Sequence, residues 1–127
     1  MNILLWVLQV LLAALFLAHG LMFLFPPADM VATMNASIPP ALRLFIGAAE
    51  VLAAIGLTLP GVTRIQPRLV PLAAAGLMFV TSGAALFHAS RGEVAPAIGT
   101  AILFMLLTFV AYMRLIVLPI SPRASVN

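Results

Sequence analysis

Four long apolar runs constrain the fold of this chain more than any other feature. They cover residues 3–25, 41–59, 69–89 and 94–118. A helix rises about 1.5 Å per residue and the hydrocarbon layer of a bilayer is about 30 Å thick, so about 20 residues suffice to cross it. Each run therefore predicts one transmembrane helix. The expected fold is all-α, an integral membrane four-helix antiparallel bundle that forms one transmembrane domain over residues 1–127.

The composition agrees with lipid as the solvent of this chain. Apolar residues make up 65% of the sequence and charged residues 7%, whereas soluble domains are about half apolar and about a quarter charged. The net charge of +3 comes from six basic and three acidic residues, too few to build a basic surface for nucleic acid. Cys is absent, which excludes disulfides, thiolate nucleophiles and Cys-ligated metal centres. Two His and three carboxylates spread along the chain predict no metal site.

Proline and glycine mark where the expected helices begin and end. A proline pair at 26–27 should stop the first helix, so residues 28–37 are expected to form a polar loop or interfacial turn. Pro60, followed by glycine, should close the second helix at residue 59. The linker at residues 90–93 is so short that the third and fourth helices should be antiparallel neighbours.

The distribution of arginine predicts the orientation in the membrane. Four crossings place both termini on one side, where four arginines are expected against two on the other side: Arg64, Arg68, Arg114 and Arg123 against Arg43 and Arg91. By the positive-inside rule, both termini should be cytoplasmic. We therefore expect a multi-pass protein of the cell's inner (plasma) membrane, with Trp6 and Tyr112 at the cytoplasmic interface.

Ionisable residues inside the runs are the best candidates for a site. An ionisable side chain at the centre of a membrane helix costs about 2.5–3.5 kcal/mol on insertion scales, so each needs a partner or a function. Glu50 lies at the middle of the second run, and Arg43 precedes it by two turns on nearly the same face. His19, Arg43 and His88 should all lie in the outer half of the bilayer. We expect an outward-opening polar cavity with Glu50 at its floor as a proton relay, and His19, Arg43, Glu50 and His88 as ligand-binding residues.

Structural roles remain open for the same residues. Arg43 and His88 could extend to the membrane interface, and Glu50 could hydrogen-bond across helices and hold the bundle together. For Arg114 and Gln9, on the opposite side, structural roles are favoured: Arg114 should extend to the interface, and Gln9 should hydrogen-bond a neighbouring helix.

Small residues seven apart suggest close helix contacts. They form the pairs Gly47 with Ala54 in the second helix and Gly76 with Gly83 in the third. We interpret both pairs as packing seams, because small side chains let helix backbones approach closely in membranes.

Two segments resemble a known family. Residues 42–52 read LRLFIGAAEVL and residues 56–60 read GLTLP, which is similar to the R-x-x-x-G-x-x-E-x-L…G-L-x-L-P pattern of DoxX-like membrane proteins. Residues 71–77, PLAAAGL, and 88–93, HASRGE, are also similar to that family, so the resemblance covers nearly the whole chain. It implies a four-helix membrane bundle of similar length. The family's first helix often ends in a basic residue, whereas residues 22–25 here read MFLF.

The resemblance also suggests a function. The family is named for a membrane subunit of a thiosulfate:quinone oxidoreductase, and relatives associate with other redox enzymes or act as assembly factors. The first hypothesis is therefore a subunit of a membrane redox complex that binds a quinone or another small apolar ligand; the chain itself would carry no cofactor. The second is a non-catalytic assembly factor that docks a membrane-protein partner or forms a homo-oligomer. A third is a small membrane-embedded enzyme, in which His19 and His88 could serve haem or a metal ion.

Overall fold

The computed structural model describes residues 1–125 and contains the four expected spanning helices. The elements are α1 (Asn2–Leu24), α2 (Ala28–Ser37), α3 (Pro40–Thr63), α4 (Leu69–Ser90) and α5 (Val94–Tyr112), and α5 continues into a π-helical turn, η1 (Met113–Val117). The spans α1, α3, α4 and α5 with η1 are each long and apolar enough to cross a membrane. The prediction of an all-α antiparallel bundle of four membrane-spanning helices is confirmed.

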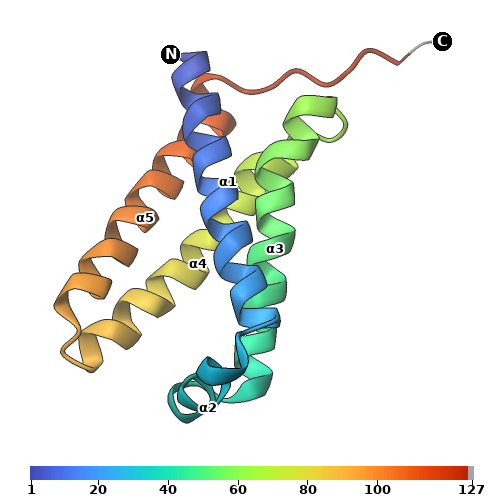
Figure 1. Cartoon of the computed structure of the whole chain (residues 1–127). Helices are drawn as coiled ribbons and strands as arrows, with labels where there is room; N and C mark the ends of the chain where they lie inside the picture. Colours follow the sequence, from blue (N-terminus) through green and yellow to red (C-terminus); the bar gives the residue numbers. More distant parts are fainter. Residues whose placement is uncertain (126–127) are drawn as a thin grey trace.

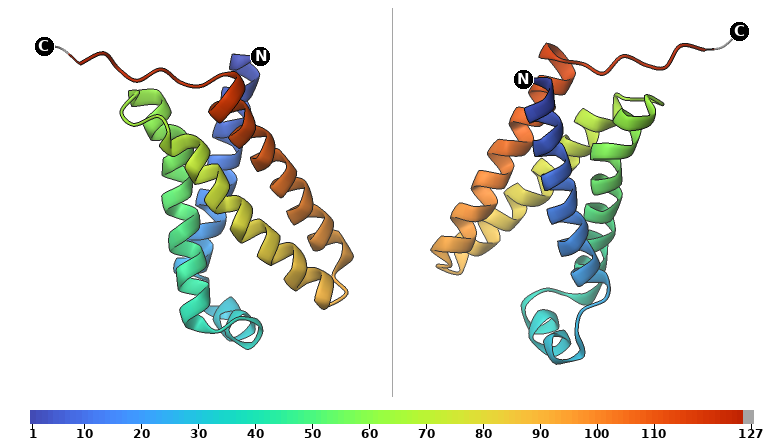
Figure 2. Two further views of the ribbon diagram at one scale, coloured as in Figure 1. Left: turned by 180° about the vertical axis from the view of Figure 1, so that it is seen from behind. Right: turned by 45° about the horizontal axis from the view of Figure 1, so that its top comes forward.

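The helices are arranged as two pairs that diverge. α1 packs on α3, α4 packs on α5, and α3 and α4 connect the two pairs. Figure 1 shows the pairs meeting at the end that holds the N-terminus and spreading apart toward the α4–α5 turn, and both views in Figure 2 agree. The shared core lies where the pairs meet, with Leu12, Leu57, Leu77, Leu107 and Val110 among its buried residues. The diverging ends leave space between the pairs.

The N-terminus and the end of η1 lie at the same end of the bundle, as four crossings require. Beyond η1 the tail runs across the α3–α4 turn (Figure 1), where the backbone N–H of Arg123 donates to the Arg64 carbonyl at 2.9 Å. Arg64 Nε in turn donates to the Ser121 carbonyl at 3.0 Å.

The structure differs from the sequence prediction at α2 and at the end of α3. Residues 28–37 form a helix instead of a loop, because this stretch is rich in alanine and methionine, which favour helix, and Asp29 stabilises its first turn. Every residue of α2 is at least partly exposed. The prediction that Pro60 ends the second helix was also wrong, since α3 continues to Thr63 with Pro60 inside it. A proline removes only one backbone donor, and membrane helices tolerate this loss where neighbours bond the nearby carbonyls.

A buried polar cluster joins the two helix pairs where they meet. Gln9 is fully buried, and its Nε2 donates to the Leu57 carbonyl of α3 at 2.8 Å, in the turn that precedes Pro60. Arg114 of η1 donates through Nε to Gln9 Oε1 at 2.5 Å and through Nη1 to Asn2 Oδ1 at 2.8 Å. The prediction that Arg114 extends to the interface was wrong, because its side chain turns inward and only 4% of the residue is exposed. The structural role predicted for Gln9 is confirmed.

Candidate functional site

A glycine contact between α1 and α3 positions the ionisable residues. A Cβ built on Gly47 would lie 2.9 Å from the Gly20 carbonyl oxygen, and one built on Gly20 would lie 2.8 Å from the Gly47 carbonyl oxygen. Real Cβ atoms essentially never come within 3.0 Å of another heavy atom in this way. The backbones can therefore approach this closely only because both residues are glycine. His19 and Glu50, each next to this contact, are brought within reach of each other.

His19 and Glu50 form a hydrogen-bonded pair. His19 Nδ1 lies 2.6 Å from Glu50 Oε2. The Glu50 side chain is 4% exposed and the His19 side chain 43% exposed, so the carboxylate stands behind the imidazole. When Glu50 is ionised, Nδ1–H of His19 donates to it, which leaves Nε2 on the far side of the ring as a proton acceptor.

The pair lies on the wall of a cavity between the diverging helix pairs. The cavity has a volume of about 680 Å³ and is lined by residues of α1, α3, α4 and α5, by the last residue of α2 and by the α2–α3 connection. Most lining side chains are apolar, and His19, Glu50 and His88 are its ionisable residues among those that the structure describes. Ser37, Thr81 and Thr100 also line it, but each hydroxyl donates to a carbonyl of its own helix: Thr33 at 3.2 Å, Leu77 at 2.9 Å and Pro96 at 3.0 Å. The imidazoles and the carboxylate are therefore the groups available to a ligand.

His88 belongs to a second cluster, at the α4–α5 turn. Its Nδ1 lies 2.5 Å from Glu93 Oε2, and Arg91 Nε donates to Glu93 Oε1 at 3.0 Å. Arg91 also stacks on Phe87, with 5.3 Å from its Cζ to the ring centroid. These hydrogen bonds hold the pKa of Glu93 below its ordinary value of 4.5. The hydrogen bond with His88 has the larger effect on this pKa, and the one with Arg91 the next largest. As in the first pair, a carboxylate orients the imidazole through Nδ1.

Arg43 takes a different place from the one expected. It is buried on the face of α3 that packs against α1 and lies outside the residues that line the cavity. Its Nη1 donates to the Phe23 carbonyl in the last turn of α1. The carbonyls at a helix C-terminus lack partners within the helix and carry partial negative charge. The last turn of α1 has no basic residue, so Arg43 of α3 provides the positive charge that this end of α1 lacks.

The structure thus brings three of the four predicted residues to one cavity, His19, Glu50 and His88. Whether they bind a ligand stays a prediction, as does the proton-relay role of Glu50. Within residues 1–125, no group of three or more His, Cys, Asp or Glu side chains is placed to hold a metal ion. A haem or metal ion in this cavity would have the Nε2 atoms of His19 and His88 as its candidate protein ligands.

Sequence reasoning missed the aromatic lining of the cavity. Phe16 and Phe23 lie one turn before and one turn after His19 on α1, and the His19 and Phe23 ring centroids are 4.4 Å apart. Phe87 adjoins His88 on α4. The signal was present in the spacing, because residues three and four apart share a helix face, but phenylalanine is so common in apolar runs that spacing alone does not distinguish a cavity lining from lipid contact.

The packing seam predicted in α4 was also wrong. Gly47 and Ala54 are buried on the α1-facing side of α3, as expected. In contrast, a Cβ added at Gly76 or Gly83 would meet no heavy atom within 4 Å in the described part of the chain. Gly83 lines the cavity, and Gly76 lines a groove on another side of α3 and α4. Gly76 and Gly83 therefore leave space open beside α4 instead of bringing helices together.

Comparison with known proteins identifies the family. The comparison with curated proteins gave no match, and neither did the comparison with solved structures. The model of the DoxX-like family matches residues 7–111, which include all four spans for most of their length and the residues His19, Glu50 and His88. The chain is thus a multi-pass membrane protein that belongs to the DoxX-like family.

Proposed function

We propose that this chain binds a small lipid-soluble ligand of the quinone type in the cavity between its helix pairs and serves as a subunit of a membrane redox complex. The observation that carries the proposal is the His19–Glu50 pair, 2.6 Å apart, on the wall of an otherwise largely apolar cavity of about 680 Å³. Ligand sites are typically concave and apolar with a few polar groups that fix orientation. A quinone would fit such a site, since its ring is apolar and its carbonyl oxygens accept hydrogen bonds.

Each polar residue has a role in this proposal. A quinone oxygen accepts a hydrogen bond from the protonated imidazole of His19 and, after reduction, takes up a proton from it. Glu50, ionised behind the imidazole, stabilises the charged ring, and the neutral imidazole left after the transfer regains its proton from water at Nε2, as a general acid–base group does. His88, held by Glu93, is placed to bond a second polar group of the ligand near the α4–α5 turn. The redox reaction itself belongs to the quinone and the partner enzyme.

The test is quinone binding by the purified protein in lipid nanodiscs. We expect saturable binding of one short-tailed benzoquinone per chain. Glu50→Gln should weaken it about tenfold or more, because a hydrogen bond to a charged group contributes about 1.5–3 kcal/mol. Asp29→Asn is the matched control, since Asp29 is an exposed carboxylate of α2 outside the cavity lining. Absence of saturable binding, or equal loss in both variants, would contradict the proposal.

A docking role without catalysis is the second candidate function. The observation in its favour is the free surface of α5, in which Leu107 and Val110 are the buried residues, whereas α1, α3 and α4 each bury five or more. A partner helix or another copy of the chain could pack on this surface. Redox turnover of a co-purified partner enzyme distinguishes the two candidates: under the first it depends on Glu50, and under the second it survives Glu50→Gln.

A further inference from the structure

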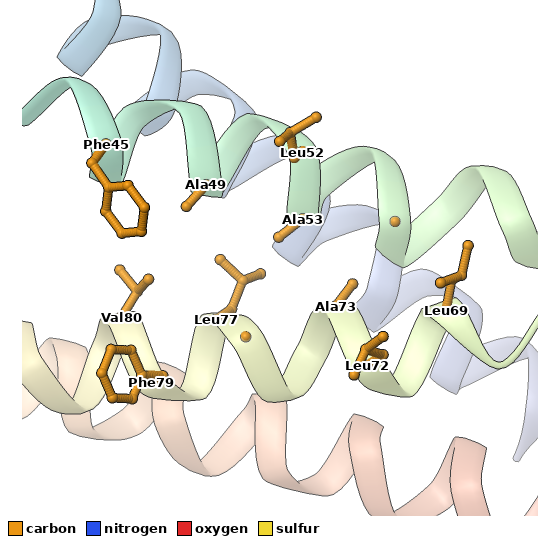
Figure 3. Close-up of a pocket in the computed structure, with 12 residues that line it drawn as sticks. Phe45, Ala49, Leu52, Ala53, Leu69, Leu72, Ala73, Leu77, Phe79 and Val80 are labelled. Carbon is orange, nitrogen blue, oxygen red and sulfur yellow. The ribbon is translucent and has the colours of Figure 1, made fainter.

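An apolar groove runs along the junction of α3 and α4, on the side of α3 away from α1. It has a volume of about 470 Å³, and all of its lining residues are apolar. Figure 3 shows Ala49 and Ala53 pointing from α3 toward α4, with Ala73 and Leu77 opposite them. We call it the α3–α4 groove. It exists because alanine and glycine occupy positions where larger side chains would fill the junction.

This groove adjoins the cavity. Phe45, Phe79 and Val80 line both hollows, and Figure 3 places these three together at one end of the groove. At the other end the helices close, because a Cβ on Gly56 would lie 2.8 Å from the Ala73 Cβ. From Phe45 to Gly56, α3 advances about 16 Å at about 1.5 Å per residue. The hollow is thus an elongated groove that begins beside the cavity and ends where α3 and α4 come together.

We propose that the α3–α4 groove holds the apolar tail of the ligand whose polar head binds in the cavity. This rests on the function proposed above and specifies the ligand class, a lipid-soluble molecule with a polar ring and a long linear tail. Lipid chains are as apolar as the groove, so burial alone would not favour the tail over a bilayer lipid. A tail tethered to a bound head, however, is at a high effective concentration beside the groove.

Two exposed aromatic side chains at the junction of cavity and groove fit this path. Phe45 is 67% exposed and Phe79 80% exposed, so neither is locked into the core. Both can rotate to let a tail pass from the cavity into the groove. The tail would then extend along α3 from the level of Phe45 past that of Glu50, toward the end of the bundle that holds the N-terminus.

The experiment compares two benzoquinones, one with a methyl group and one with a long alkyl tail, in nanodiscs at matched concentrations in the membrane. The wild-type protein should bind the long-tailed quinone about tenfold more tightly, and Gly76→Leu should remove this advantage while leaving the short-tailed affinity within about twofold. Gly99→Leu is the matched control, because Gly99 is an exposed α5 glycine that, like Gly76, has open space around it in the described chain. The Gly99→Leu variant should still bind the long-tailed quinone about tenfold more tightly than the short-tailed one.

Any other outcome contradicts the inference, and the outcomes distinguish failure of the tail site from failure of the head site. Equal affinities for the two quinones in the wild type, or a tail advantage that survives Gly76→Leu, would place the tail elsewhere while leaving head binding intact. Failure of both quinones to bind would remove the proposed function together with the inference. Because the chain has no native Cys, Gly76→Cys gives a single thiol, and disulfide-linked pairs of chains formed through it would show that a second copy covers the groove instead.

Discussion

The contact between Gly20 and Gly47 allows a quantitative prediction. The new methyl group of Gly47→Ala would lie 2.9 Å from the Gly20 carbonyl oxygen and 3.0 Å from Leu24 Cγ and Phe23 Cβ. Ordinary contact for a Cβ begins at 3.4 Å, so α1 and α3 must separate by about half an ångström. If nothing else moves, the His19–Glu50 distance then grows from 2.6 Å to about 3.1 Å, at the long end of the hydrogen-bond range.

The energetic cost follows from the same geometry. Overpacking of a close contact destabilises by about 1–3 kcal/mol, so Gly47→Ala should lower the free energy of unfolding by that amount. Gly99→Ala is the control, because its methyl group enters open space and alanine favours helix over glycine by up to about 1 kcal/mol. The two variants should therefore change stability in opposite directions. Titration with a denaturing detergent, followed by circular dichroism, measures both.

Two results would refute this reasoning. Equal stability of Gly47→Ala and Gly99→Ala would mean that the contact is not tight. A destabilised Gly47→Ala that binds a short-tailed quinone as well as the wild type does would mean that the glycine contact does not position the His19–Glu50 pair for binding.

Two further predictions concern the polar clusters at the two ends of the bundle. Arg114→Leu leaves the side-chain oxygens of Gln9 and Asn2 without their donor, so it should lower the free energy of unfolding by about 1–3 kcal/mol. Arg123→Gln, on the exposed tail, should be neutral, and equal effects in detergent unfolding would contradict the role of the cluster. Glu93 has a folded pKa below its ordinary value, so its ionised form stabilises the fold, and this contribution is present above about pH 4.5 and declines as the pH falls through the lower folded pKa. The difference in melting temperature between wild type and Glu93→Gln should therefore be full at pH 7 and shrink below pH 4.5; a pH-independent difference would disprove it.

The spans could be predicted because they depend on local properties. Length and hydropathy are read directly from the sequence, and all four expected helices lie within a few residues of their observed bounds. The position of His19, Glu50 and His88 in one cavity also followed from their depth along the helices. The position of a residue along its helix gives its depth in the membrane, however, but not the direction in which its side chain points. Arg43 has the expected height but lies on the face of α3 that packs against α1, and its side chain donates to a carbonyl in the last turn of α1.

Long-range polar contacts could not be predicted. Arg114 bonds residues 105 and 112 positions away in the sequence, and no local pattern encodes which helices meet at that point. An arginine near a helix end in a membrane usually extends to the interface; here two acceptors from α1, buried Gln9 and exposed Asn2, hold its side chain inside. The open space around Gly76 could not be predicted either. A small residue permits close contact between helices, but it does not determine whether a neighbouring helix is there.

The most direct test of the cavity as the ligand site uses its two imidazoles. The chain contains two His residues, and both line the cavity. Nitrogen NMR of protein labelled with ¹⁵N-histidine therefore shows only His19 and His88, and His19→Gln assigns the signals. Addition of a short-tailed benzoquinone should shift both sets of imidazole resonances saturably, with the larger change at His19. Resonances that stay unchanged while the quinone partitions into the same nanodiscs would contradict the account.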